Sequence, residues 1–333
     1  MGVDLITMWS GRAWRNDAED WVRTTLDAQG INVTGPIEQP RVRPWSTQLT
    51  VPTDQGLVWF KENNPGQRAE AAIVQVLATV VPDHVVVPLA VEPERGWLLT
   101  PDHGATLRSL ESTDEGLWTR VLTEYADLQR RLVPHEGELV AAGLERLTPQ
   151  MCPAYVAEQV QTWERLPAQD PLHLDSTAAA ELRASLPRLR QAADELAGGP
   201  VPMSLDHNDL HHNNAFAPTQ DETGLPLRFF DFGDAVWAHP FSSLRVTLNV
   251  VTKEWHAAAT DPRVRRLTDS YLEVWSDLAD LTDLRRLLDL ALEFAPIHRA
   301  ESWRRLLAYA DEATLAEFGS APLTWLWQIT AGG

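Results

Sequence analysis

HNDLHHNN, residues 207–214, and DFGD, residues 231–234, are two polar clusters in more apolar surroundings towards the middle of the chain. Two short, mostly apolar runs connect them, at 215–217 and at 225–230. A turn-rich segment, TQDETG at 219–224, separates the two runs, and this order is typical of a β-hairpin. Because a hairpin brings its two ends together, we expect the two polar clusters to lie side by side.

Three polar residues of these clusters, Asp209, Asn214 and Asp231, should therefore converge, although up to 22 residues separate them. Phosphoryl transfer needs a carboxylate beside the attacking hydroxyl group and oxygen ligands for magnesium. The pattern H-x-D-x-x-x-x-N, followed by D-F-G, supplies both kinds of group. With both motifs in this order, the chain resembles the aminoglycoside phosphotransferase family, a small-molecule branch of the protein-kinase-like fold.

The resemblance implies a role for each residue of the two motifs. Asp209 would be the catalytic base, and Asn214 and Asp231 would be the magnesium ligands. His207 would pack against Phe232 and hold the catalytic loop in place. The implied cofactors are ATP and Mg²⁺.

The histidines of the first cluster, His207, His211 and His212, allow a different interpretation as a transition-metal site, because imidazole is the commonest metal ligand. His207 and His211 are four residues apart, which suits one face of a helix. The neighbouring asparagines and the apolar strand that follows disfavour a helix here. We therefore prefer the phosphotransferase interpretation.

The implied fold is of the α+β class, protein-kinase-like and two-lobed, with a small β-rich N-terminal lobe and a larger, mostly helical C-terminal lobe. A helix at about 18–29 comes first, and strand-like segments follow at 45–51, 57–61, 84–91 and 96–100. Helical patterns occupy 68–80, 117–132, 150–166, 176–197, 241–252, 262–277, 281–293 and 295–310. We therefore divide the chain into a nucleotide-binding lobe, 1–104, and a catalytic and substrate lobe, 105–333. The resemblance covers most of 40–310, but its specific motifs occupy only 207–234.

Composition restricts the cellular setting and the partners. The chain has 333 residues, which suits two lobes of roughly 100 to 200 residues each. Its 47 acidic and 28 basic residues give a net charge of −19, and such a field repels nucleic acid and anionic membranes. The single Cys152 fits a reducing compartment, and we find neither a signal-peptide pattern nor a membrane-length apolar run. We expect a cytoplasmic protein whose oligomeric state the sequence does not fix.

Lys61 ends the second strand of a predicted hairpin, and Glu70 lies in the first turn of the helix that follows. The resemblance implies that Lys61 reaches the nucleotide phosphates and that Glu70 pairs with it. Glu62 should point to the opposite face of the strand. The alternatives are that Lys61 protects an exposed sheet edge and that Glu70 only complements the helix dipole.

Two further pairs are candidates for nucleotide contacts. Thr100 and Asp102 lie at the expected hinge between the lobes, where kinase-like proteins hold adenine, although an ordinary turn would read the same. A G-x-G-x-x-G loop is absent, so Ser46 and Thr47 are left as possible phosphate donors or as ordinary strand residues.

The segment after D-F-G favours a small-molecule acceptor. It runs almost directly into a helix, without the activation segment and the A-P-E motif of protein kinases. Ser243 stands where the family usually has a structural aspartate, which puts the rigidity of the catalytic loop in doubt.

We interpret the chain as an ATP-dependent phosphotransferase for a small hydroxylated acceptor: an aminoglycoside, another sugar or amino sugar, or an amino alcohol. The alternative is a nucleotide-binding module without turnover. Acidic residues of the late helices, Glu293, Glu301, Asp311 and Glu312, could border the acceptor pocket and favour an amine, or they could form a solvated surface.

Overall fold

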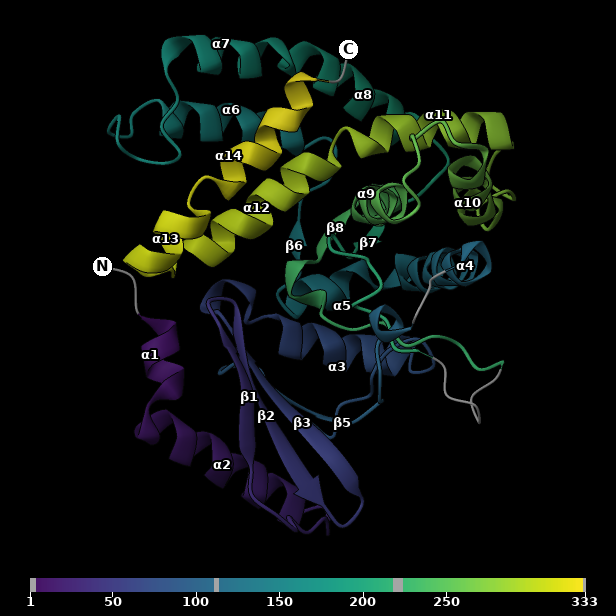
Figure 1. Ribbon diagram of the computed structural model, residues 1–333. Helices are drawn as coiled ribbons and strands as arrows, with labels where there is room; N and C mark the ends of the chain where they lie inside the picture. The colour runs from purple at the N-terminus through teal and green to yellow at the C-terminus, as the bar shows by residue number, and fades with distance from the viewer. Residues whose placement is uncertain (1–3, 111–113, 218–223, 332–333) are drawn as a thin grey trace.

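The computed structural model of the chain describes residues 4–110, 114–217 and 224–331. It confirms the α+β class, with a small lobe built on an antiparallel sheet and a larger helical lobe (Figure 1). The sheet has five strands, in the spatial order β1 (Glu38–Arg43), β2 (Ser46–Thr53), β3 (Gly56–Asn63), β5 (Trp97–Pro101) and β4 (Ala90–Glu92).

Strand alternation gives the sheet two different faces. Leu49, Val51, Val58 and Phe60 are buried on one face, against α2 (Arg12–Asp27), which follows α1 (Leu5–Ser10). Side chains at the intervening positions of β2 and β3 face the other lobe. The helix expected at about 18–29 is α2, which begins earlier in the chain, at Arg12. It covers the outer face of the sheet (Figure 1).

Glu62 attaches the N-terminal helices to this outer face, as strand alternation predicts for a neighbour of Lys61. Its carboxylate accepts hydrogen bonds from three indole N–H groups, those of Trp9 at 3.0 Å, Trp14 at 2.7 Å and Trp97 at 2.5 Å. A partly buried carboxylate needs such donors to replace the water that it loses. Glu62 therefore belongs to the packing of the small lobe and not to the cleft.

The strand expected at 84–91 is wrong over most of its length, because only its last two residues belong to β4. The segment before it leaves α3 (Glu70–Val80) through turns and carries the buried side chains of Val85 and Val86. A short apolar run can be buried without joining a sheet, and periodicity does not separate the two cases.

The large lobe contains eleven α-helices among the described residues. They are α4 (Glu115–Leu132), α5 (Glu136–Ala141), α6 (Cys152–Trp163), α7 (Ser176–Ala184), α8 (Leu186–Gly198), α9 (Leu244–Glu254), α10 (Pro262–Glu273), α11 (Leu281–Leu292), α12 (Ala295–Leu307), α13 (Glu312–Phe318) and α14 (Ala321–Leu326). The single helix expected at 176–197 is two, because Pro187 begins a new helix and Ser185 lies between them. Within the described ranges, no helix combines the length and the apolar character that crossing a membrane requires.

A small second sheet, which we did not predict, carries the two polar clusters. Its order is β6 (Glu145–Arg146), β8 (Val236–Ala238) and β7 (Ser204–Asp206), and Asp206 on β7 pairs with Val236 on β8. The chain enters the first cluster from β7 and leaves the second cluster into β8. The sheet thus fixes both clusters at their outer ends.

The predicted hairpin holds the inner ends of the clusters. Phe216 donates its N–H to the carbonyl of Arg228 at 3.0 Å, and Phe230 donates to Asn214 at 3.1 Å. Ala215 and Phe229 form an antiparallel bridge. Most of the expected turn, at 219–223, lies outside the described residues.

The lobes meet closely at the turn between β1 and β2. Asn64 donates to the carbonyls of both Pro44 in this turn and Leu306 on α12, at 3.1 and 3.2 Å. A Cβ atom on Gly66 would lie 2.1 Å from the carbonyl oxygen of Arg305, so only glycine allows this approach. Trp45 from the turn joins Trp303 and Phe318 in an aromatic contact between the lobes.

His239 lies in the core just after β8 and predicts a specific pH dependence. Its Nδ1 accepts the N–H of Phe241 at 3.3 Å, whereas its buried Nε2 has no hydrogen-bond partner among the described residues. Burial, with a smaller effect of His298, lowers the pKa of His239 to about 3.

The folded state therefore keeps His239 neutral where the unfolded chain, with a pKa of about 6.5, binds a proton. The contribution of His239 to the free energy of unfolding is fully present above about pH 6.5. It decreases by about 1.4 kcal/mol for each pH unit as the pH drops from there towards 3. In His239→Asn the amide oxygen can still accept from Phe241. Urea unfolding between pH 6.5 and 5 should show a stability loss about 2 kcal/mol larger for the wild type than for the variant. Parallel curves would contradict the assignment.

Candidate active site

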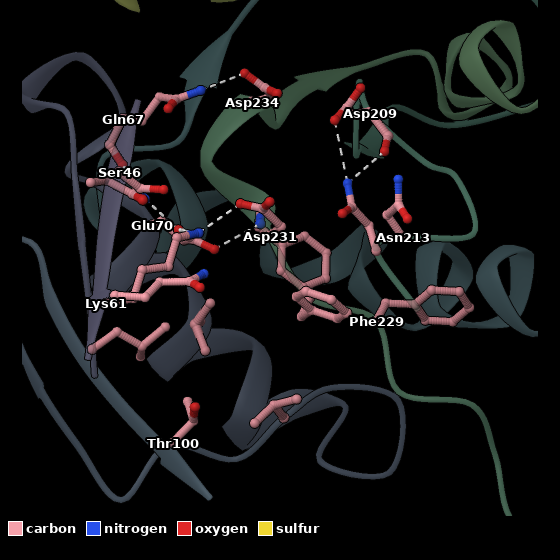
Figure 2. A pocket seen from close by; sticks show the side chains of 18 of the residues that line it. Ser46, Lys61, Gln67, Glu70, Thr100, Asp209, Asn213, Phe229, Asp231 and Asp234 are labelled. Carbon is pink, nitrogen blue, oxygen red and sulfur yellow. Dashed lines mark hydrogen bonds and ion pairs between the residues drawn. The ribbon is translucent and has the colours of Figure 1, made fainter. Parts of the chain in front are cut away.

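A cavity of about 760 Å³ lies between the two lobes. Its wall combines the inner faces of β2, β3 and β5 with α3, the two polar clusters and α12 (Figure 2). All but one of the residues nominated for catalysis, nucleotide contacts or magnesium binding line this cavity: Ser46, Lys61, Glu70, Thr100, Asp102, Asp209, Asn214 and Asp231. The exception is Thr47.

Lys61 lies at the centre of an ion-pair group that joins the lobes. Its Nζ is 2.6 Å from Glu70 Oε2 and 2.6 Å from Asp231 Oδ1 (Figure 2). Burial by itself lowers the pKa of Lys61, but Asp231 and Glu70 outweigh it and raise the pKa above its ordinary value. Because β3 lies between β2 and β5, Lys61 does not protect a sheet edge, and that alternative is wrong.

Glu70 is buried and fully engaged. Its Oε2 accepts from Lys61 and from Asn63 Nδ2, and its Oε1 accepts the N–H of Phe232 at 3.0 Å. The ion pair that the resemblance implied is thus present. Glu70 lies in the first turn of α3, but its contacts go beyond the helix dipole, because they hold both Lys61 and the second polar cluster.

Asp231 presents its carboxylate to the cavity. Its backbone is left-handed, with φ 67° and ψ 55°, and about half of its side chain is exposed, at 47%. Desolvation within the cleft raises the pKa of Asp231, but the attraction of Lys61 lowers it by more, so the pKa lies below its ordinary value. The carboxylate therefore stays ionised and keeps one oxygen available for a further partner.

Asp209 and Asn214 meet as the hairpin predicted. Asn214 Nδ2 donates to the backbone oxygen of Asp209 at 2.9 Å and to its Oδ2 at 3.3 Å. His211 Nε2 lies 3.3 Å from the same Oδ2. Burial raises the pKa of the Asp209 carboxyl, but Arg299 and His211 outweigh it and hold the pKa well below its usual range.

Asp206, on β7, holds the loop that carries Asp209 through hydrogen bonds. Asp206 Oδ1 accepts the N–H of Asn208 at 2.7 Å and the hydroxyl of Ser243 at 2.8 Å, and its Oδ2 faces His298 Nδ1 at 2.8 Å. The hydroxyl of Ser243 also accepts the N–H of His207 at 3.3 Å. Ser243 has no charge of its own, but its hydroxyl group is hydrogen-bonded to Asp206, and the Asp206 carboxylate supplies the negative charge.

The three histidines of the first cluster do not share a site. His207 packs on Phe232 with ring centroids 4.9 Å apart, as expected, and its Nε2 lies 3.1 Å from the carbonyl of Phe230. His211 pairs with Asp209, whereas His212 lies 3.2 Å from Glu254. No group of three metal-binding His, Cys, Asp or Glu side chains occurs within the described ranges. The histidine metal site is therefore wrong.

Thr47 is not part of the cavity, in contrast to our expectation. Its hydroxyl donates to the carbonyl of Arg41 at 3.1 Å and accepts from Gln39 Nε2 at 2.8 Å. Ser46 and Gln48, its neighbours on β2, do line the cavity. The reason is strand alternation, which places adjacent side chains on opposite faces.

The hinge region lies along the end of β5. Asp102 accepts from Trp59 Nε1 at 2.9 Å, and its N–H donates to the carbonyl of Leu57 at 2.9 Å. This N–H is therefore already used within the sheet. The carbonyl of Leu99 accepts the N–H of Leu89, on the side of the strand that faces β4. Carbonyls two residues apart in a strand point the same way, so the carbonyl of Pro101 points to this side too. It lies beyond the last residue pair between β4 and β5.

Asp234 of the second polar cluster contacts three residues that the sequence analysis missed. Its Oδ1 accepts from Gln67 Nε2 at 2.6 Å and from the hydroxyl of Ser302, and its Oδ2 faces Arg299 at 3.1 Å. Ser302 and Arg299 lie one turn apart on α12. Their only sequence signal is that spacing on a predicted helix, which many surface helices share.

The acidic residues expected at an acceptor pocket do not line the cavity. Glu293 pairs with Arg188, and Glu301 is buried against Tyr155 at 2.7 Å and Arg304. The remaining two lie at the start of α13, where Asp311 caps the helix and Glu312 occupies its first turn. The expectation that these side chains border the cavity is wrong.

The fold resembles several solved phosphotransferases. APH(2")-IIia, solved as a complex with GDP and kanamycin, has a TM-score of 0.59 at 14% identity, over 95% of this chain and 99% of that one. The ethanolamine kinase of Plasmodium vivax has a TM-score of 0.63 at 11% identity, over 92% and 87%. A macrolide 2'-phosphotransferase of Brachybacterium faecium has a TM-score of 0.57 at 12% identity, over 91% and 97%.

No protein-family model matches the sequence, and no curated protein matches it significantly. The structural comparisons and the two motifs agree with each other, since the motifs lie at the cleft of a kinase-like fold. The resemblance that the motifs indicated is therefore confirmed at the level of the fold: the chain has the two-lobed architecture of the aminoglycoside phosphotransferases.

Proposed function

We propose that this protein is an ATP-dependent phosphotransferase that transfers the γ-phosphoryl group to a hydroxyl group of a small molecule. One observation carries the proposal. The Lys61–Glu70 pair, Asp231, Asn214 and Asp209 face a single interlobe cavity, each with the type of side chain that phosphoryl transfer uses.

The polar groups at the cavity fit a magnesium ion. Asp231 offers a half-exposed carboxylate, and Asn214 points its Nδ2 at Asp209, which leaves its amide oxygen as the remaining polar atom. Magnesium prefers oxygen ligands and keeps several waters when it bridges phosphates. Asn214 and Asp231 would hold the ion, and when bound it would neutralise charge on the phosphates.

The chain's own residues supply the remaining functions. Lys61, held by Glu70, binds phosphate oxygens of the nucleotide through its ammonium group. Asp209 orients the acceptor hydroxyl and accepts its proton as the hydroxyl oxygen bonds to the γ-phosphorus. The bond from that phosphorus to the bridging oxygen of the nucleotide breaks, so the products are the phosphorylated acceptor and ADP.

The adenine base fits the end of β5. Pro101 lines the cavity, and its carbonyl points past the end of β4, so we infer that this carbonyl accepts a hydrogen bond from the adenine amino group. Thr100 and Asp102 flank this carbonyl, with the Asp102 N–H held by Leu57. A guanine base presents a carbonyl oxygen at the corresponding position, and this supports ATP over GTP.

A turnover assay tests the proposed function directly. Purified protein with Mg²⁺ and ATP should phosphorylate at least one member of a panel that contains kanamycin, spectinomycin, a macrolide, ethanolamine and neutral sugars. Tight ATP binding without turnover on any acceptor, and without slow ATP hydrolysis, would instead identify a nucleotide-binding module.

The charge of the acceptor is a separate prediction. The acids at the transfer end of the cavity are already paired: Asp209 and Asp234 face Arg299, and Asp231 faces Lys61. Trp45 and Trp303 supply apolar surface there. We therefore expect neutral hydroxylated acceptors to react at least as well as matched amines, with little salt dependence.

Paired kinetic measurements check this expectation. Each amino sugar or amino alcohol is compared with its neutral hydroxyl analogue, at low and at high salt. An amine that is preferred by more than about tenfold in kcat/KM, with the preference lost at high salt, would contradict it.

A further inference from the structure

Arg299, on α12, contacts the proposed catalytic base, Asp209. Its Nη1 lies 3.3 Å from Asp209 Oδ1, 3.1 Å from Asp234 Oδ2 and 3.0 Å from the carbonyl oxygen of Asn208. Only 11% of its side chain is exposed, at the cavity wall. One guanidinium group thus binds two carboxylates and the backbone of the loop that carries one of them.

Burial of this cation is compensated by the carboxylates that it binds. Removing a guanidinium group from water costs several kcal/mol unless opposite charges and hydrogen bonds replace the lost hydration. Asp209 and Asp234 provide both, and arginine stays charged at every pH at which proteins fold. The contact therefore persists whatever the state of the neighbouring histidines.

The two oxygens of Asp209 are held from different directions. Oδ2 faces Asn214 and His211, which belong to the same loop as Asp209. Oδ1 faces Arg299, which comes from α12. Contacts on both oxygens fix the rotation of the carboxylate about its last bond, and the contact from α12 ties that rotation to the framework of the lobe.

Arg299 is also tied to the small lobe. Asp234 accepts from Gln67 on the small lobe as well as from Arg299 and Ser302 on α12. The guanidinium group therefore connects the orientation of Asp209 with the contact between the lobes. None of the other proposed roles, phosphate binding by Lys61 or metal binding by Asp231, involves this side chain.

We propose that Arg299 is a positioning residue, which orients the Asp209 carboxylate towards the acceptor hydroxyl and keeps it there during phosphoryl transfer. The inference rests on the proposed function, in which the hydroxyl proton passes to Asp209 as the new phosphorus–oxygen bond forms and the bond to ADP breaks. Arg299 itself exchanges no proton and forms no bond. Its loss should therefore affect the chemical step more than the binding of nucleotide.

The test compares kcat with nucleotide KM in Arg299→Ala and Arg299→Lys, with magnesium-dependent ATP hydrolysis as the assay and water as the acceptor. A small misplacement of a catalytic group can cost about 10²-fold, so Arg299→Ala should lose about 10² in kcat while KM for ATP changes little. Millimolar guanidinium chloride should restore much of this activity, whereas sodium chloride should not. A purely structural role of Arg299 would not respond to guanidinium.

Arg245→Ala is the matched control. Arg245 on α9 is also partly buried, its Nε also lacks a hydrogen-bond partner among the described residues, and its Nη2 bonds Gln328 rather than a carboxylate of the site. This variant should keep the wild-type kcat. If Arg299→Ala does not fold, Arg299→Lys decides: it should lose kcat about tenfold, since an ammonium group cannot make the same contacts.

Comparison with Asp209→Ala separates the two proposals. If Asp209→Ala loses activity while folded Arg299→Ala or Arg299→Lys keeps the wild-type kcat, the role of Arg299 is overturned and the proposed function stands. If Asp209→Ala keeps its activity, the proposed mechanism is overturned and the role of Arg299 falls with it. Loss of kcat in both, with guanidinium rescue of Arg299→Ala only, supports both.

Discussion

Asp209→Ala should lower kcat by about 10² to 10⁴, which is the usual contribution of a general base. The reason is that the acceptor hydroxyl loses both its proton acceptor and the group that orients it. In the proposed function nucleotide binding depends on Lys61 and on the metal ligands Asn214 and Asp231, so the affinity for magnesium–ATP should change little. Initial rates with saturating ATP, and calorimetric titration of the same variant, measure the two quantities.

Asp277→Ala is a suitable control for this variant, because Asp277 is an exposed partner of Arg130 far from the cleft, and its loss removes a carboxylate of the same size. It should retain normal turnover. Near-normal turnover in Asp209→Ala would remove Asp209 from the catalytic role, whatever the behaviour of the control.

Asp231→Asn should weaken magnesium-dependent binding of ATP by more than about 100-fold, because loss of a direct ligand exceeds the 10- to 100-fold effects of removing groups that only support ligands. Asparagine is the better substitution than alanine here. Asp231 has a φ of 67°, and asparagine tolerates this left-handed conformation. The backbone of the second polar cluster should therefore stay in place.

Calorimetry with ATP in the presence of magnesium, and with ATP in the presence of EDTA, isolates the metal-dependent part. The wild type should lose affinity when the metal is removed, whereas Asp231→Asn should bind ATP equally weakly in both conditions. Unchanged magnesium–ATP affinity in the variant would argue against Asp231 as a ligand. Circular dichroism before titration verifies that the variant is folded.

The features that the sequence predicted are those with a local pattern. The hairpin between the polar clusters follows from apolar runs and turn residues, and it brings Asp209, Asn214 and Asp231 together as expected. Strand alternation placed Glu62 opposite Lys61. The same rule, applied to Ser46 and Thr47, would have excluded Thr47, so that error was avoidable from the sequence.

The features that could not be predicted depend on contacts between distant parts of the chain. Arg299 lies 90 residues after Asp209, and nothing in its local sequence distinguishes it from the other arginines of α12. Asp206 supports the loop together with Ser243 and His298, and these three residues come from three separate elements. The acids of the late helices were misplaced for the same reason, because helical periodicity does not show which partners a side chain meets.

Three tryptophans line the cavity wall, and under the proposed function their fluorescence would report the binding of the two substrates. Trp59 is near the hinge, where its indole donates to Asp102, whereas Trp45 and Trp303 lie at the opposite end, beside α12. A nucleotide base and an acceptor would therefore quench different fluorophores. Rapid mixing with Trp59→Phe and Trp303→Phe would then time the arrival of each substrate without a label, and so establish whether binding is ordered or random.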